Sequence, residues 1–90
     1  MKQMHFTVHG KVQGVWFRAW TQDLAKELGL TGWVRNTSDG NVEGLALGED
    51  TQLAKFKERL HDGPPLARVT QVDSAESEAE DIIDSFNVRP

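Results

Sequence analysis

The sequence predicts a single α+β domain, a ferredoxin-like β-α-β-β-α-β sandwich with an antiparallel sheet and two helices on one face. The length, 90 residues, suits one small domain with one core. Segments in which apolar and polar residues alternate are interleaved with two segments in which apolar residues recur every three or four positions. The order of these segments is that of the split β-α-β arrangement. We therefore expect one domain over residues 1–90.

The first strand and the first helix frame a loop. Apolar and polar residues alternate over residues 3–9, which is typical of a half-buried strand. Residues 11–16 break this alternation and predict a loop. The next segment predicts a helix that ends at Gly29, since glycine is common just after a helix C-terminus. The stripe expected on its buried face comprises Phe17, Trp20, Thr21, Leu24, Ala25 and Leu28.

A hairpin follows the first helix. Residues 30–35 and 42–47 predict two strands, and the Asp39-Gly40 step between them is a hairpin signal. In the predicted topology the first two strands run in the same direction, with the third between them. The loop after the first strand and the end of the second strand then emerge at the same edge of the sheet, roughly 10 Å apart. Side chains from both places can therefore contact one small ligand.

A second helix follows the hairpin. Asp50 or Thr51 is expected to cap its N-terminus, and Gly63 followed by two prolines is expected to end it. Apolar residues recur at helical spacing within these limits. The predicted buried stripe is Leu53, Phe56 and Leu60.

The C-terminal third of the sequence predicts a fourth strand and a possible short fifth strand. Val69 and Val72 indicate a fourth strand, but their spacing of three predicts a bulge or an early end. The acidic stretch 73–84 predicts a solvated loop. Alternation at residues 86–88 predicts a possible short fifth strand.

Composition excludes several classes of function. A net charge of −4 argues against nucleic-acid binding, because counterion release requires a basic surface. An RNA-recognition domain shares the element order, but it would need a basic sheet face with aromatic residues on its central strands. No apolar run could cross a bilayer, no secretory signal is visible, and the absence of cysteine suits a reducing compartment. We expect a cytoplasmic monomer that binds neither nucleic acid nor membranes.

The start of the first helix breaks two local rules. No residue of the run 15–17 offers the side-chain oxygen that normally caps a helix. Arg18 then places a positive charge at the positive end of the helix dipole. One anion would repair both faults, because it would accept from the free N–H groups and pair with the guanidinium. Gly10 and Gly14 would let the backbone approach it closely. The alternative is that Gly14 serves only as a turn and Arg18 reaches a surface carboxylate.

Asn36 stands at the end of the second predicted strand and has two interpretations. Asparagine beside Asp39-Gly40 is common turn chemistry, because its side chain bonds nearby backbone. Its position at the same sheet edge as Arg18 also allows its amide to contact a shared ligand. The local pattern leaves both interpretations open.

Two motifs resemble the signatures of the acylphosphatase family. Residues 8–18, VHGKVQGVWFR, resemble the first signature. Residues 32–36, GWVRN, followed at the matching spacing by Gly40, Val42 and Gly48, resemble the second. The predicted element order is that of the family fold. One departure is the C-terminus, where many relatives end in an aromatic residue and this chain ends in proline.

The resemblance implies an enzyme that hydrolyses the carboxyl-phosphate bond of small acyl phosphates, such as acetyl or carbamoyl phosphate, and releases inorganic phosphate without a metal or other cofactor. It implies that Arg18 binds the phosphate oxygens and that Asn36 holds the attacking water. The implied phosphate-binding residues are Lys11, Val12, Gln13, Gly14, Val15, Trp16, Phe17 and Arg18. The alternative is a module that binds acyl or carbamoyl phosphate without independent turnover, because similar domains occur fused within carbamoyltransferases that mature hydrogenases.

Overall fold

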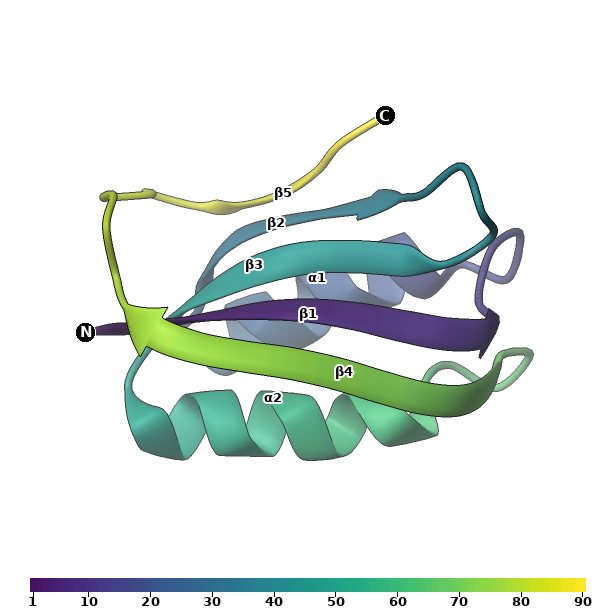
Figure 1. Ribbon diagram of the computed structural model, residues 1–90, viewed down its shortest axis with the longest axis horizontal. Coiled ribbons are helices and arrows are strands. Elements are labelled where there is room, and N and C mark those ends of the chain that lie inside the picture. Colours follow the sequence, from purple (N-terminus) through teal and green to yellow (C-terminus); the bar gives the residue numbers. More distant parts are fainter.

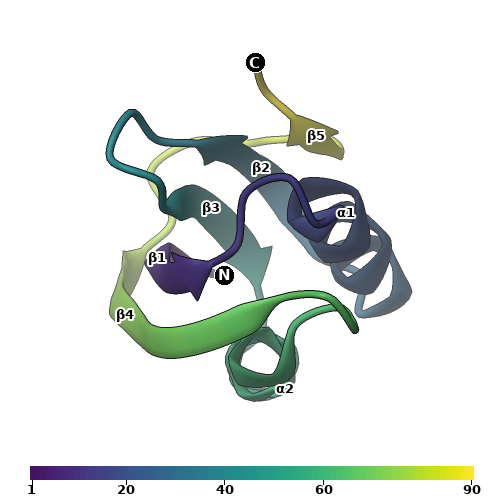
Figure 2. The same cartoon turned by 90° about the vertical axis from the view of Figure 1, so that its right-hand side faces the viewer.

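The computed structural model describes residues 1–90 and contains two helices and one sheet of five strands. In chain order the elements are β1 (Lys2–Lys11), α1 (Phe17–Glu27), β2 (Thr31–Asn36), β3 (Val42–Gly48), α2 (Asp50–Asp62), β4 (Arg68–Glu78) and β5 (Phe86–Val88). The strand order across the sheet is β4-β1-β3-β2-β5, and both helices cover the same face (Figures 1 and 2). The predicted ferredoxin-like sandwich is confirmed.

Strand directions bring two segments of the chain to one edge of the sheet. β3 lies between β1 and β2 and pairs antiparallel with both, so β1 and β2 run in the same direction. The end of β1 and the end of β2 therefore lie at the same edge, on the right in Figure 1. The short fifth strand exists, but β5 pairs parallel with β2, with Gly32 opposite Phe86. The sheet is therefore mixed rather than wholly antiparallel.

One aromatic cluster joins the helices to the sheet. The Phe56 ring of α2 meets Phe6 of β1 edge-on at 5.3 Å and Phe86 of β5 at 6.2 Å between ring centroids. All three rings are fully buried. The predicted stripe of α2 is buried throughout, whereas in α1 Trp20 and Leu28 are only partly buried. Burial of these apolar faces holds both helices on the sheet. Neither helix, at 11 and 13 residues, is long enough and apolar enough to cross a membrane.

The second helix begins one residue earlier than expected. Its N-cap is Glu49, whose side chain makes no capping hydrogen bond. The first turn closes when the Leu53 N–H donates to the Glu49 carbonyl at 3.0 Å, so Asp50 is already helical. The predicted cap at Asp50 or Thr51 is therefore wrong. Gly63, with φ 67°, ends the helix as predicted.

The fourth strand extends further than the acidic composition indicated. β4 pairs with β1 from Lys11 back to Lys2, so residues 73–78 are strand and the predicted loop is wrong there. Charged side chains are tolerated because β4 is an edge strand and its acidic residues face solvent. Asp73 accepts hydrogen bonds from Gln71 and from His9, and these bonds hold the pKa of Asp73 below its usual range.

The predicted bulge in β4 is confirmed. His9 pairs with Gln71 while Gly10 pairs with Val69, which leaves Thr70 as the extra residue of β4. The bulge turns Val69 and Val72 toward the same face despite their spacing of three, and both pack against the core.

Candidate active site

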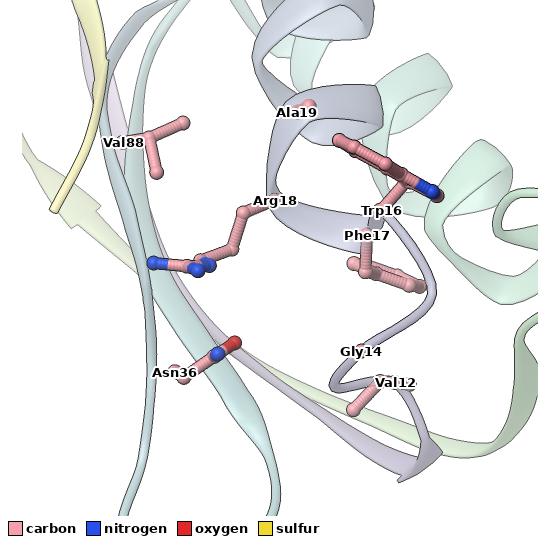
Figure 3. A pocket seen from close by; sticks show the side chains of 8 residues that line it. All are labelled: Val12, Gly14, Trp16, Phe17, Arg18, Ala19, Asn36 and Val88. Atoms are coloured by element: carbon pink, nitrogen blue, oxygen red, sulfur yellow. The ribbon is translucent and has the colours of Figure 1, made fainter. Parts of the chain in front are cut away.

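A pocket of about 410 Å³ opens at the edge of the sheet where β1 and β2 end. This volume lies within the range of roughly 300–1,000 Å³ typical of small-molecule sites. The pocket is formed by the loop after β1, the first turn of α1, the end of β2 and β5 (Figure 3). Its lining residues are Val12, Gly14, Trp16, Phe17, Arg18, Ala19, Asn36 and Val88. Arg18 is the only charged residue among them, which favours an anionic ligand.

The loop between β1 and α1 contains two residues with left-handed backbone. Gly14 has φ 75° and Trp16, the N-cap of α1, has φ 66°. Trp16 is the only non-glycine residue with positive φ, a conformation that costs free energy and often occurs at functional sites. Left-handed residues that alternate with ordinary ones turn successive N–H groups toward one side and form anion-binding concavities.

The backbone N–H groups of this loop have no partner in the protein. The first hydrogen bond of the helix runs from the Trp20 N–H to the Trp16 carbonyl at 3.0 Å. No N–H group from Val12 to Ala19 donates to a carbonyl or to a side chain. A helix start leaves several N–H groups free, but here the free run continues backwards through the loop. The segment is therefore suited to accept an anion such as phosphate.

Arg18 projects from the first turn of α1 into the pocket, between Val88 and Asn36 (Figure 3). Its Nη1 donates a hydrogen bond to the Arg89 carbonyl oxygen at 3.0 Å. The guanidinium has five N–H donors, so most remain available to a ligand. Arg18 forms no ion pair, because the two ion pairs of the protein join His9 to Asp73 and Arg35 to Glu43. The alternative in which Arg18 reaches a surface carboxylate is therefore wrong.

Arg89, the residue after Val88, provides the carbonyl oxygen that accepts the hydrogen bond from Arg18, and two contacts hold Arg89 in place. The Arg89 N–H donates to the Val34 carbonyl of β2 at 2.8 Å. The Arg89 guanidinium lies over the Trp33 ring, 4.4 Å from its centroid. These two contacts hold the Arg89 carbonyl beside Arg18, so the C-terminal segment helps to orient the guanidinium. Local sequence offered no signal for this contact, because it depends on the parallel pairing of β5 with β2.

Asn36 is the last residue of β2, and its side chain is directed toward the same space as the Arg18 guanidinium (Figure 3). The Asn36 amide makes no hydrogen bond within the protein. The contacts that close the turn are made by Thr37 instead. The Thr37 N–H donates to the Asn41 carbonyl at 2.9 Å, and the Asn41 N–H donates to Thr37 Oγ1 at 3.0 Å. The Thr37 hydroxyl also donates to Asp39, which holds the pKa of Asp39 below its usual range. The interpretation of Asn36 as a turn-forming side chain is therefore wrong.

Comparison with known proteins identifies the family. The family model described as acylphosphatase matches residues 4–88. The chain belongs to the acylphosphatase family. The acylphosphatase of Marinobacter nauticus is 51% identical over 76 residues, which cover 84% of this chain and 83% of that protein. The crystal structure of the acylphosphatase from Bacillus subtilis superimposes with a TM-score of 0.97 at 38% identity, covering 100% of both chains.

A second kind of relative carries a similar domain inside a longer chain. HypF from T. kodakarensis matches with a TM-score of 0.86 and 32% identity. The match covers 99% of this chain but only 12% of that chain. The acylphosphatase fold thus occurs both as a chain of about this length and as a small part of a larger protein.

Most of the predicted phosphate-binding residues can contact an anion only through their backbone. The side chains of Val12, Val15 and Phe17 are buried in the core. Lys11 is the exposed last residue of β1 and does not line the pocket. Trp16 lies at the pocket rim and is 79% exposed. We call the free N–H groups from Val12 to Ala19 the cradle; an anion bound there would meet these backbone groups and one cationic side chain, Arg18.

The two glycines of the first signature have different roles. A Cβ at Gly10, which has φ 122°, would lie 2.1 Å from the Arg68 carbonyl oxygen of β4. Gly10 therefore permits the close approach of β4 at the bulge, and its predicted role beside the ligand is wrong. A Cβ at Gly14 would meet no atom within 4 Å, so glycine is required there by the left-handed backbone.

Proposed function

We propose that this chain hydrolyses the carboxyl-phosphate bond of small acyl phosphates to a carboxylate and inorganic phosphate, without a metal ion. The observation that carries the proposal is the run of free N–H groups from Val12 to Ala19 beside the Arg18 guanidinium. The unpaired amide of Asn36 faces the same pocket. Family membership supports the same chemistry. Acetyl and carbamoyl phosphate represent the expected substrate class.

The cradle and Arg18 bind the three non-bridging phosphate oxygens. Phosphoryl transfer depends mainly on alignment and on stabilisation of the charge on these oxygens, which N–H groups and a guanidinium provide. The Asn36 amide oxygen accepts a hydrogen bond from the attacking water. As the water oxygen bonds to phosphorus, the bond from phosphorus to the acyl oxygen breaks and its electron pair leaves with the carboxylate. A carboxylate is a good leaving group, so the step needs no strong general acid.

The proton of the attacking water goes to a phosphate oxygen of the substrate. An amide such as Asn36 orients water but does not remove a proton at neutral pH. No carboxylate or histidine lines the pocket, and no group of three or more His, Cys, Asp or Glu side chains in the structure could hold a metal ion. The substrate phosphate is therefore the base nearest to the water in this mechanism.

The second candidate is a module that binds acyl or carbamoyl phosphate without turnover, as the HypF match permits. The free-standing relatives favour the enzyme, since this chain matches 83% of the length of the Marinobacter nauticus acylphosphatase. We propose further that the enzyme acts as a monomer in the cytoplasm. The absence of cysteine is compatible with that compartment.

We expect purified protein in excess chelator to release phosphate from acetyl phosphate at the same rate as protein without chelator. We expect hydrolysis of glycerol 3-phosphate, an ordinary monoester, to be at least about 100-fold slower, because its alkoxide leaving group needs protonation or a metal ion, which this pocket does not offer. Phosphate release measured colorimetrically on both substrates tests this. Activity lost in chelator and restored by Mg²⁺ or Zn²⁺ would contradict the metal-free mechanism, and binding of acetyl phosphate without turnover would favour the module.

We expect inorganic phosphate to raise the melting temperature of the protein. An anion that binds only the native state stabilises it by about 1.4 kcal/mol at ten times its dissociation constant. For a domain of this size that corresponds to a rise of about 5–10 °C. Arg18→Ala should show a much smaller rise, while Arg59→Ala, which removes an exposed arginine of α2, should respond like the wild type. Equal rises in Arg18→Ala and the wild type would mean that phosphate binds elsewhere.

A further inference from the structure

The Gln13 side chain connects the phosphate-binding loop to the turn beside Asn36. Gln13 Nε2 donates to the Thr37 carbonyl oxygen at 2.8 Å and to the Asn41 carbonyl oxygen at 2.8 Å. A glutamine amide has two N–H hydrogens, so both are used. The acceptors lie on opposite arms of the turn between β2 and β3. Gln13 therefore spans the turn immediately after Asn36.

These bonds are the only hydrogen bonds between the loop at residues 12–16 and the hairpin at residues 36–41. The remaining hydrogen bonds of the hairpin are internal to it, such as those between Thr37 and Asn41. Gln13 is therefore the one hydrogen-bonded link between the cradle and the turn after Asn36, in addition to the strand pairing and the buried side chains of the loop. Gln13 is half-buried, so its two bonds are partly shielded from competition with water.

Gln13 does not act on the anion through its side chain. Both of its N–H groups point to carbonyl oxygens, and the remaining amide oxygen is an acceptor, which an anion does not favour. Its backbone N–H belongs to the free run of the cradle, but the side chain is committed to the hairpin. The resemblance to the family signature implied that Gln13 binds phosphate, and in the structure only its backbone N–H is free to do so.

We propose that Gln13 is a positioning residue, which holds the bound phosphate in line with the water on Asn36. This inference rests on the proposed function. The reaction needs the water, the phosphorus and the leaving oxygen in line, and a misplacement of about 1 Å can lower the rate 10²-fold. The cradle holds the phosphate group, and Asn36 at the end of β2 holds the water. Gln13 fixes the distance between these two elements.

Gln13→Ala should therefore lower kcat by about 10-fold to 100-fold and change the inhibition constant of inorganic phosphate by less than about threefold. Gln13→Glu keeps the shape but places an acceptor oxygen against two carbonyl oxygens. It should lose activity at neutral pH and regain part of it in acid, because the protonated carboxyl group donates one hydrogen bond again. The wild type and Gln13→Ala should lack this recovery. The matched control is Gln3→Ala, which removes a glutamine hydrogen bond to Ser77 on β4.

The decisive readout does not require turnover. Amide hydrogen exchange measured with and without inorganic phosphate should show slower exchange in residues 12–16 and in residues 37–41 of the wild type. In Gln13→Ala the protection should persist in the loop and disappear from the turn. Unchanged kcat and undiminished protection of the turn would overturn the proposal, and so would a loss of phosphate affinity as large as the loss of kcat. A wild type that binds phosphate and protects the turn without hydrolysing acyl phosphates would instead refute the proposed function and leave the link through Gln13 standing.

Discussion

Replacing Arg18 with alanine should reduce kcat/KM for acetyl phosphate by about 10³-fold or more and weaken inhibition by inorganic phosphate. An arginine that stabilises a transferring phosphoryl group typically contributes a factor of about 10³–10⁵. Arg18 is the only charged residue lining the pocket, so no second cation can replace it. Because the guanidinium contacts phosphate before and during the reaction, both binding and turnover should suffer. Steady-state kinetics with phosphate as inhibitor measure both effects.

Two further variants make this result interpretable. Arg18→Lys keeps the charge but loses the planar fork that bonds two oxygens at once, so it should restore only part of the activity. Arg59→Ala removes an exposed arginine of α2 and should leave the kinetics unchanged. An Arg18→Ala enzyme with nearly normal kcat/KM and normal phosphate inhibition would show that Arg18 neither binds phosphate nor contributes to turnover.

Asn36→Ala should lower kcat by about 10²–10³-fold while the phosphate inhibition constant stays within about threefold of the wild type. That magnitude is typical of removing one polar group that acts mainly in the transition state. The melting temperature should barely change, since the Asn36 amide makes no hydrogen bond within the protein and Thr37 makes the turn contacts. The control is Asn87→Ala, an exposed asparagine on β5 whose side chain forms hydrogen bonds only with Ser85.

The fold could be predicted from the sequence because its main features are local or periodic. Alternation in β1 and the helical stripe of α2 report directly which side chains meet the core, as the contact of Phe6 with Phe56 illustrates. The limits of β4 could not be predicted in this way, because residues 73–78 are held by backbone pairing with β1 and not by burial of their side chains. The parallel direction of β5 depends on a crossover from β4 that no local pattern encodes.

The site was only partly predictable for the same reason. Arg18 and the free N–H groups were visible because they break local rules of helix capping and charge. The role of Gly10 could not be read locally, because the atom that fills its missing Cβ position belongs to β4. The hydrogen bonds of the Arg89 carbonyl and of the Gln13 side chain could not be predicted either, since their partners are distant in sequence. The local pattern could not decide between two roles for Asn36, and the unpaired amide excludes the structural one.

In the proposed mechanism, phosphate binding and water orientation come from two different elements, the loop with α1 and the end of β2. Measuring the inhibition constant of inorganic phosphate in Asn36→Ala, together with kcat for acetyl phosphate on the same preparation, separates these two roles. The division of roles predicts a phosphate inhibition constant like that of the wild type and a kcat lower by about 10²–10³-fold. A stable Asn36→Ala enzyme with full kcat, or one that loses phosphate affinity as strongly as it loses kcat, would contradict it.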